Sequence, residues 1–304
     1  MSGTKPASQS RPDLLGSTAV LFAAACWATS GVFVKLFGEA VAISALALAF
    51  WRDLTTFVVL LLGVGILHPR WLRVQRRDLA WLAALGVSLG TFHVFWNVGV
   101  FLNGASVATV QQAAMPAIVA VVAWLAWREP LTRTRILAIL LTIAGTVLVS
   151  GIDLSDQSGL GPAGLLVGLG IPVTYAAWNL LGKKVRENYS PFTVLTYAFG
   201  FGALVLLPLQ FFTPQPSRVP VSAWPWFAGL IGLATLTGFA VYTYALGRLS
   251  ASVASILAMT EIAFVAVYAY LLLGERLTTV QVLGALLVGG GASLLVWPRS
   301  RAKA

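Results

Sequence analysis

The stretch NGASVATVQQAAMPAIVAVVAWLAWREPLT at residues 103–132 reappears in outline as LSASVASILAMTEIAFVAVYAYLLLGERLT at residues 249–278. Both copies contain Ala-Ser-Val-Ala near their start, continue through an apolar segment, and end with a Glu followed by Leu-Thr two residues later. Apolar composition alone does not produce a repeated Glu129 and Glu275 or a repeated Ala-Ser-Val-Ala. The sequence therefore predicts two related halves.

The composition is that of a membrane protein. Of the 304 residues, 58% are hydrophobic and 10% are charged, whereas soluble domains carry about 25% charged residues. Apolar runs of about 20 residues match a hydrocarbon core about 30 Å thick. The net charge of +10 comes from Lys and Arg in short loops between these runs, as expected beside a membrane, and does not indicate nucleic-acid binding.

The apolar runs and the loops between them predict an all-α membrane protein of ten transmembrane helices. The predicted spans are 14–37, 41–67, 78–100, 105–127, 134–151, 161–182, 190–212, 222–247, 251–273 and 279–297.

The distribution of Lys and Arg predicts the orientation. With both termini in the cytoplasm, nearly all basic residues fall in inside segments, and only Arg218 and Arg276 lie outside. This asymmetry follows the positive-inside rule.

Each half holds five predicted spans, and an odd number requires the second half to be inverted relative to the first. Inverted repeats are typical of secondary transporters, with the substrate near the midplane. The predicted organisation is a cytoplasmic tail at 1–13, a first five-helix repeat at 14–151, a second at 161–297 and a cytoplasmic tail at 298–304. The sequence lacks a GxxxxGK[ST] phosphate loop, which argues against ATP-driven transport. Its single Cys26 predicts neither a disulfide nor a cysteine metal site, and no cofactor is expected.

These motifs resemble the drug/metabolite transporter superfamily. The residues that carry the resemblance are WREPLT at 127–132, LLGERLT at 272–278, and a Gly-containing span after each. The similarity extends over about residues 14–297 and is greatest to the EamA-type ten-helix transporters. Within that superfamily the aromatic-rich interior is most like that of the aromatic amino acid exporters. One departure is Ile262 after Glu261, where many relatives carry Pro.

The third and fourth spans supply polar candidates for substrate binding. Gly86, Gly90, His93 and Asn97 recur at helical spacing, with Trp96 beside them. They predict either the lining of a cavity or a helix-packing face of small residues. Gln111 and Gln112 precede Pro116, which interrupts the helical hydrogen-bond ladder and either exposes a carbonyl to the cavity or forms a plain kink.

Aromatic residues in three other spans are the second group of candidates. Their positions predict walls for a flat substrate or a belt at the membrane interface. They are Trp27 in the first span, Tyr175 and Trp178 with the neighbouring Asn179 in the sixth, and Tyr242 in the eighth.

Three charges lie deep within predicted spans, where ionisable side chains are costly. Arg52 and Asp53 near the middle of the second span form either a structural ion pair or, through Arg52, a site for a substrate carboxylate. Glu261 in the ninth span is a candidate for a substrate ammonium group or a coupling proton, or a structural hydrogen-bonding group.

The sequence therefore predicts a non-enzymatic secondary transporter that exports small amphipathic metabolites. Aromatic or other apolar amino acids are the favoured substrates. An exporter of organic cations or drugs is the alternative, followed by a membrane-embedded enzyme or a non-transporting membrane module. The expected partners are the lipid bilayer and a small-molecule substrate. The sequence is compatible with both a monomer and an oligomer. The expected location is the plasma membrane, multi-pass, which is the inner membrane in a bacterium.

Overall fold

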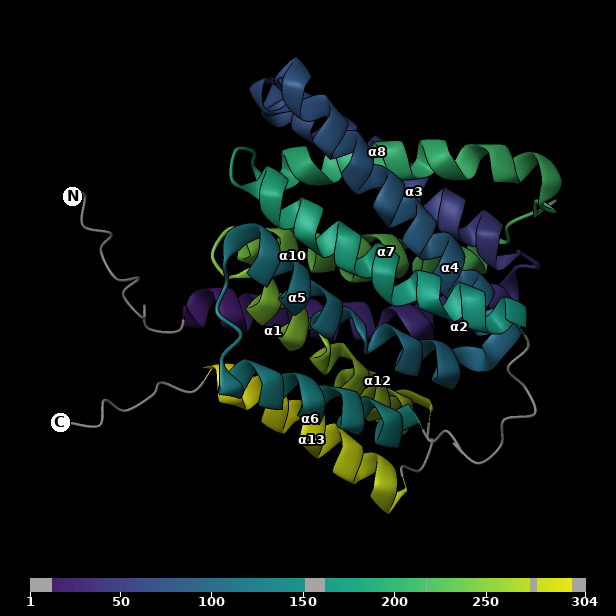
Figure 1. Ribbon diagram of the computed structural model, residues 1–304. Helices are drawn as coiled ribbons and strands as arrows, with labels where there is room; N and C mark the ends of the chain where they lie inside the picture. Colours follow the sequence, from purple (N-terminus) through teal and green to yellow (C-terminus); the bar gives the residue numbers. More distant parts are fainter. Residues whose placement is uncertain (1–12, 151–161, 217, 274–277, 297–304) are drawn as a thin grey trace, which may run out of the picture.

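The computed structural model describes residues 13–150, 162–216, 218–273 and 278–296, with some side chains in these ranges, including those of 100–110, left out. The described residues form helices and no strand. The axes of most helices lie roughly along one line across the bundle, whichever way the chain runs (Figure 1). Among the described residues, five helical segments are long and apolar enough to cross a membrane, and three shorter apolar helices accompany them.

In the first half of the chain, the described residues form six α-helices and two short 3-10 turns. In chain order they are α1 (Leu14–Ala28), α2 (Ser30–Ala40), α3 (Ala45–Leu67), η1 (Pro69–Leu72), η2 (Arg76–Asp78), α4 (Leu79–Gln112), α5 (Met115–Trp127) and α6 (Arg133–Ser150).

In the second half, the part of the chain that the structure describes forms seven α-helices, two 3-10 turns and one π-helix. In chain order they are α7 (Pro162–Arg186), α8 (Pro191–Leu206), η3 (Leu207–Phe212), η4 (Val221–Ala223), α9 (Trp224–Gly229), the π-helix η5 (Leu230–Thr237), α10 (Gly238–Leu246), α11 (Ala251–Ala258), α12 (Thr260–Leu273) and α13 (Thr279–Val296).

The helix breaks differ from those predicted. Helical backbone continues through 102–104, where the sequence predicts a loop, and stops instead at Ala113–Ala114. Pro116 explains this position, because it lacks an N–H and is accommodated in the first turn of a new helix. The predicted first and ninth spans are also divided, at Thr29 and Met259. The break at Met259 occurs although Ile262 replaces the proline.

Helices α6 and α13 lie side by side at one edge of the bundle (Figure 1). A Cβ atom added to Gly145 would lie 2.6 Å from the Gly284 carbonyl oxygen, and one on Gly291 would lie 2.9 Å from that of Ala138. The pairing of 145 with 284 and 138 with 291 makes the two helices antiparallel. Small residues at these positions allow close backbone contact, as in other membrane helix pairs.

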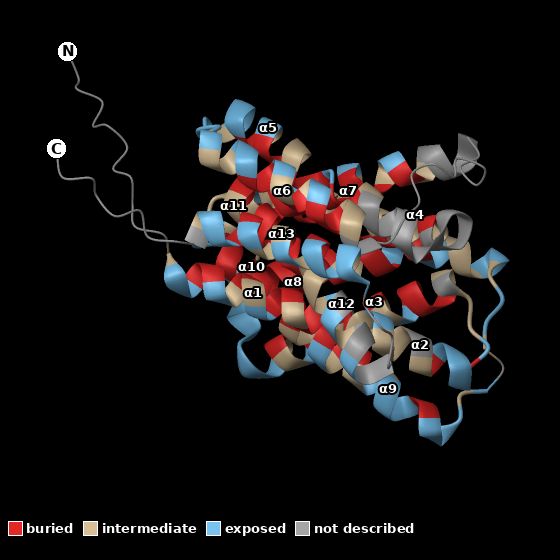
Figure 2. Cartoon of the chain, turned by 90° about the horizontal axis from the view of Figure 1, so that it is seen from below, coloured by how far each residue is buried: buried red, intermediate tan, exposed pale blue. Residues whose placement is uncertain are grey.

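The outer surface of the bundle is apolar. Side chains such as Leu62, Ile66, Leu271 and Leu286 are more than half exposed, while buried positions gather on the faces that helices turn toward one another (Figure 2). A contiguous apolar exterior is unusual for a soluble monomer and suits contact with lipid.

Candidate functional site

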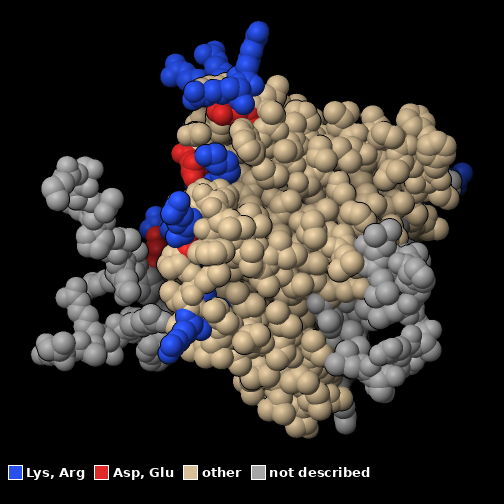
Figure 3. Space-filling view, in the orientation of Figure 1, with Lys and Arg blue, Asp and Glu red and all other residues tan. Residues whose placement is uncertain are grey.

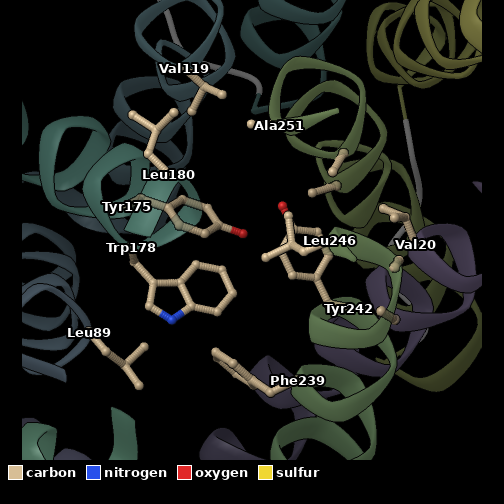
Figure 4. Close-up of a cluster of buried hydrophobic side chains, with 14 of the residues drawn as sticks. Val20, Leu89, Val119, Tyr175, Trp178, Leu180, Phe239, Tyr242, Leu246 and Ala251 are labelled. Carbon is tan, nitrogen blue, oxygen red and sulfur yellow. The ribbon is translucent and has the colours of Figure 1, made fainter. Parts of the chain in front are cut away.

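Five aromatic side chains from three helices form a buried cluster. Trp27 on α1 contacts Tyr242 and Phe239 of α10, with ring centroids 4.9 and 5.1 Å apart. Trp178 of α7 stacks on Tyr242 at 5.5 Å and lies 5.8 Å from Tyr175. Figure 4 shows the rings of Tyr175, Trp178, Phe239 and Tyr242 turned toward one another. We call Trp27, Tyr175, Trp178, Phe239 and Tyr242 the aromatic cluster; the sequence had singled out all of these except Phe239.

A glycine makes room for Trp27. A Cβ atom on Gly238 would lie 2.7 Å from Cδ1 of the indole, so only a residue without a side chain lets α10 approach α1 so closely. The indole is 5% exposed, and its Nε1 has no hydrogen-bond partner among the described residues. An unpartnered buried donor is rare in proteins.

Asn179 links α7 to α10. Its Nδ2 donates a hydrogen bond to the Tyr242 hydroxyl, and both side chains are fully buried. In the described part of the chain its Oδ1 has no partner. The cluster thus offers one unused donor, Trp27 Nε1, and one unused acceptor, Asn179 Oδ1.

Arg52 of α3 lies beside the aromatic cluster. Its Nε donates to Oγ1 of Thr235 at 2.9 Å, and its guanidinium carbon lies 5.8 Å from the ring centroid of Phe239. Thr235 belongs to the π-helix η5, a type of segment often found at functional sites. Sequence reasoning missed Thr235 and Phe239; the available signal was a pair of threonines, Thr235 and Thr237, inside an apolar span.

Glu261 lies in the first turn of α12, directly after the break at Met259. Its half-buried carboxylate interacts electrostatically with Arg52 and with the hydroxyl of Tyr175. The aromatic cluster therefore has a cation on one side, Arg52, and a carboxylate that interacts with it, Glu261.

Asp53 pairs with His93 of α4. Oδ2 of Asp53 lies 3.0 Å from Nδ1 of His93, and both side chains are buried. The two consecutive residues Arg52 and Asp53 therefore point to different partners, although their charges still interact. His93 lies next to Phe92, whose ring stacks on Tyr175 at 4.7 Å.

The glycines of the third predicted span form a packing face. A Cβ atom on Gly86 would lie 2.8 Å from the Ala198 carbonyl oxygen, and one on Gly90 would lie 2.8 Å from that of Gly202. These contacts leave no room for a guest at Gly86 or Gly90, so the packing alternative applies to them.

The other residues that the sequence predicts for substrate binding are not members of the aromatic cluster. Trp96 is half-buried and takes part in no ring contact among the described residues. Gln112 is buried, and Gln111 packs its amide against Gly168 of α7. The side chain of Asn97 lies outside the described residues.

Polar contacts gather at one end of the bundle, which we call the basic end. Almost all Lys and Arg side chains in Figure 3 gather along one side of the visible face. At this end Lys183 donates to the carbonyl oxygens of Leu246 and Leu249, at 2.9 and 2.7 Å. Arg248 forms an ion pair with Asp13 at 2.9 Å.

A second contact at the basic end joins α5 to α11. The Glu129 carboxylate accepts hydrogen bonds from the Ala251 N–H at 3.0 Å and the Ser252 hydroxyl at 2.7 Å. Arg135 pairs with Glu129 at 3.3 Å and donates to the Ser250 hydroxyl. The carboxylate thus caps the amino terminus of α11, where negative charge is favourable.

The family model of the EamA-like transporter family matches this chain twice, over residues 14–151 and 162–297. The chain belongs to the EamA-like transporter family. It is similar to an uncharacterized transporter of Archaeoglobus fulgidus, 28% identical over 134 residues, and spans only 47% of that relative's length. It is also similar to YicL, an uncharacterized inner membrane transporter of Salmonella typhimurium, 27% identical over 95% of this chain and 98% of YicL.

The fold of this EamA-family chain is also found in a protein of known crystal structure. The two share a TM-score of 0.75 at 18% identity, over 92% of this chain and 95% of the other. At this identity the likeness establishes the fold alone.

Family membership and the apolar helices together make this EamA-family protein a multi-pass membrane transporter. They also favour transport over enzymatic activity. The predicted membrane location is thereby confirmed.

Proposed function

We propose that this EamA-family protein is a secondary transporter that exports small amphipathic metabolites, chiefly aromatic or other apolar amino acids, by alternating access. The observation that carries the proposal is the aromatic cluster with Arg52 and Glu261 beside it. Aromatic walls match a flat or apolar side chain, and the two opposite charges match the two ends of a zwitterion.

Each group has a defined role in this proposal. The Arg52 guanidinium binds the substrate carboxylate, because its planar donors suit two carboxylate oxygens. Glu261 binds the ammonium group. Trp27 Nε1 and Asn179 Oδ1, which have no partner within the described residues, supply further hydrogen bonds. The rings of Trp27, Trp178 and Tyr242 contact one another, so a guest must separate them.

The proposed architecture is ten transmembrane helices in two inverted halves. The antiparallel contact of α6 with α13 supports it: Gly145 approaches Gly284 just as Gly291 approaches Ala138, and a shift of about 146 residues exchanges the two contacts. A two-fold axis within the membrane plane has this effect, as in other inverted-repeat transporters. The double match of the family model agrees with the arrangement.

The closed basic end defines one state of the proposed cycle. The lopsided distribution of Lys and Arg supports its location in the cytoplasm, with both termini there. The contacts of Glu129 with Ala251 and Ser252 join the first half to the second and hold the basic end shut. Rocking of the halves would break these contacts and give the aromatic cluster access to the cytoplasm.

An organic-cation exporter is the second candidate. Glu261 and the aromatic rings favour it, because cations bind over aromatic faces. The Arg52 guanidinium, over Phe239 at 5.8 Å, opposes it through charge repulsion.

Exchange in proteoliposomes tests both candidates. Purified protein is reconstituted with labelled L-phenylalanine, L-leucine or tetraphenylphosphonium, and exchange is compared with empty liposomes. Exchange of the amino acids, reduced in Arg52→Gln, supports the proposal. Exchange of tetraphenylphosphonium alone favours the second candidate. No exchange of any of the three solutes contradicts the proposed substrate classes.

A further inference from the structure

The turn between α3 and α4 carries a group of arginines that the proposed substrate site does not use. Arg70, Arg73, Arg76 and Arg77 are all exposed. In the part of the chain that the structure describes, only Arg77 of these four forms an ion pair, at 3.9 Å from Asp78. We call residues 68–78 the basic turn. It presents three arginines that are paired with no described carboxylate.

The basic turn is fixed to α8. The Thr193 hydroxyl donates to the carbonyl oxygen of Trp71 at 2.8 Å, and the Tyr197 hydroxyl donates to that of Leu72 at 2.9 Å. The two donors lie one helical turn apart on α8 and therefore on the same face of the helix. These bonds hold the backbone that carries the arginines, so the turn loses little freedom when it binds a partner.

Aromatic and apolar side chains adjoin the arginines. The ring of Trp71 stacks on His68 and on Phe192 of α8, with centroid distances of 4.3 and 6.0 Å. Leu62 and Ile66, near the end of α3, are more than half exposed. Tryptophan is enriched at the interface between lipid acyl chains and water. This pattern places the basic turn at the depth of the lipid headgroups, directly beyond the apolar end of α3.

The basic turn lies at the rim of the bundle. The end of α3 projects at the upper edge of the bundle in Figure 1, and Figure 3, in the same orientation, shows Lys and Arg side chains standing out there. A partner can therefore reach the arginines from the surrounding membrane without entering the aromatic cluster.

We propose that the basic turn binds the headgroup of an anionic phospholipid. The lipid phosphate accepts hydrogen bonds from the guanidinium groups, whose planar donors suit phosphate oxygens, and the acyl chains lie along the exposed side chains of α3. Clusters of about four to eight basic residues beside a transmembrane helix are typical of anionic lipid binding. The inference goes beyond the proposed transport function and does not depend on its substrates.

The neighbouring side chains favour a lipid over a soluble anion. A free anion would bind the guanidinium groups but would gain nothing from Trp71, Leu62 or Ile66. A phospholipid uses both kinds of surface at once, because its charged headgroup and its apolar chains are joined in one molecule.

Native mass spectrometry of the detergent-purified protein tests the inference. Phosphatidylglycerol, which is anionic, and phosphatidylcholine, which is zwitterionic, are titrated separately, and the Kd of each is measured. We expect the wild type to bind phosphatidylglycerol more tightly. Each basic residue at an anionic lipid surface strengthens binding about fivefold, so the double variant Arg70→Gln, Arg73→Gln should bind phosphatidylglycerol about twentyfold more weakly. Its Kd for phosphatidylcholine should not change.

The matched control is the double variant Arg133→Gln, Lys184→Gln. It removes the same net charge from two exposed positions in other connections of the chain, and it should keep the wild-type Kd for phosphatidylglycerol. An equal loss in the two double variants would show that overall charge alone attracts the lipid, and would overturn the inference. Equal wild-type Kd values for the two lipids would also overturn it.

Inorganic phosphate separates a lipid site from a site for a soluble anion. An excess of phosphate at constant ionic strength should not displace phosphatidylglycerol from the wild type, because phosphate lacks acyl chains. Displacement would make the basic turn a soluble-anion site and would overturn the inference.

A second measurement uses only the wild type. Phenylglyoxal modifies accessible arginine side chains, and peptide mass spectrometry locates the products. Phosphatidylglycerol at about ten times its Kd should slow the modification of Arg70 and Arg73 about tenfold by mass action, and should leave Arg133 unaffected. Equal protection of all three arginines, or protection of none, would contradict a site at the basic turn.

Discussion

The Glu129 carboxylate, two residues after α5, accepts a 2.7 Å hydrogen bond from the Ser252 hydroxyl in the first turn of α11. It also accepts a hydrogen bond from the Ala251 N–H and forms an ion pair with Arg135. One carboxylate therefore joins the two halves of the chain at the basic end.

Glu129→Gln should loosen the basic end. A hydrogen bond to a charged group contributes about 1.5–3 kcal/mol, so its loss should favour the open state about tenfold. In a Cys26→Ser background, a cysteine at the buried Ser255 reports opening through its rate of labelling by a water-soluble maleimide.

The matched control for this variant is Glu187→Gln. Glu187 pairs with Lys184, and both side chains are over 40% exposed, so this pair contributes little. Equal labelling rates in Glu129→Gln and the parent would show that the Glu129 contact does not hold the end shut.

Tyr242→Phe should destabilise the protein without removing an aromatic ring. The substitution leaves the buried Asn179 amide without the hydroxyl that it donates to, at a cost of about 1–3 kcal/mol. Thermal unfolding in detergent measures the effect. Tyr244→Phe, at an exposed position, should change little, and an equal loss in the two variants would contradict this role of the Asn179 contact.

Gly86→Ala should push α4 away from α8. The added methyl group would lie 2.8 Å from the Ala198 carbonyl oxygen, and overpacking of this kind costs about 1–3 kcal/mol. Gly63→Ala is the control, because nothing lies within 4 Å of its added Cβ. Denaturation curves of the two variants should differ, and wild-type stability of Gly86→Ala would argue against close packing here.

The amino terminus of α1 should fray in acid. The hydrogen bond from the Gly16 N–H, together with Arg248, lowers the pKa of Asp13 below its ordinary value. The ionised Asp13 carboxylate therefore stabilises the start of α1 fully at pH values above the pKa of an unfolded Asp, about 3.9. This stabilisation is lost as the pH falls through the lower pKa that Asp13 has in the folded protein. Amide exchange at Gly16 measures the fraying, and Asp13→Asn should remove its pH dependence.

Cysteine labelling tests the proposed orientation. Ser222 in η4 and Asn188 after α7 are both exposed and flank α8 on its two sides. A membrane-impermeant reagent added to intact cells should label a cysteine at 222 and leave one at 188 unlabelled. The reverse pattern would place the basic end outside.

The sequence by itself determined the membrane-spanning character, the repeat and the charge asymmetry. These are local properties, because the length of an apolar run and the number of basic residues in a loop can be counted in the sequence without knowing which helices pack together. The aromatic candidates Trp27, Trp178 and Tyr242 were also predictable, because large rings deep in apolar spans are few.

Only the tertiary structure decided how these side chains are used. Helical spacing placed Gly86, Gly90 and His93 on one stripe, but α8 covers the two glycines while His93 meets Asp53. The partner of each helix face depends on rotation and depth relative to neighbouring helices, which sequence spacing does not define. For the same reason Thr235 and Phe239 became part of the site only when η5 and α10 were placed against Arg52.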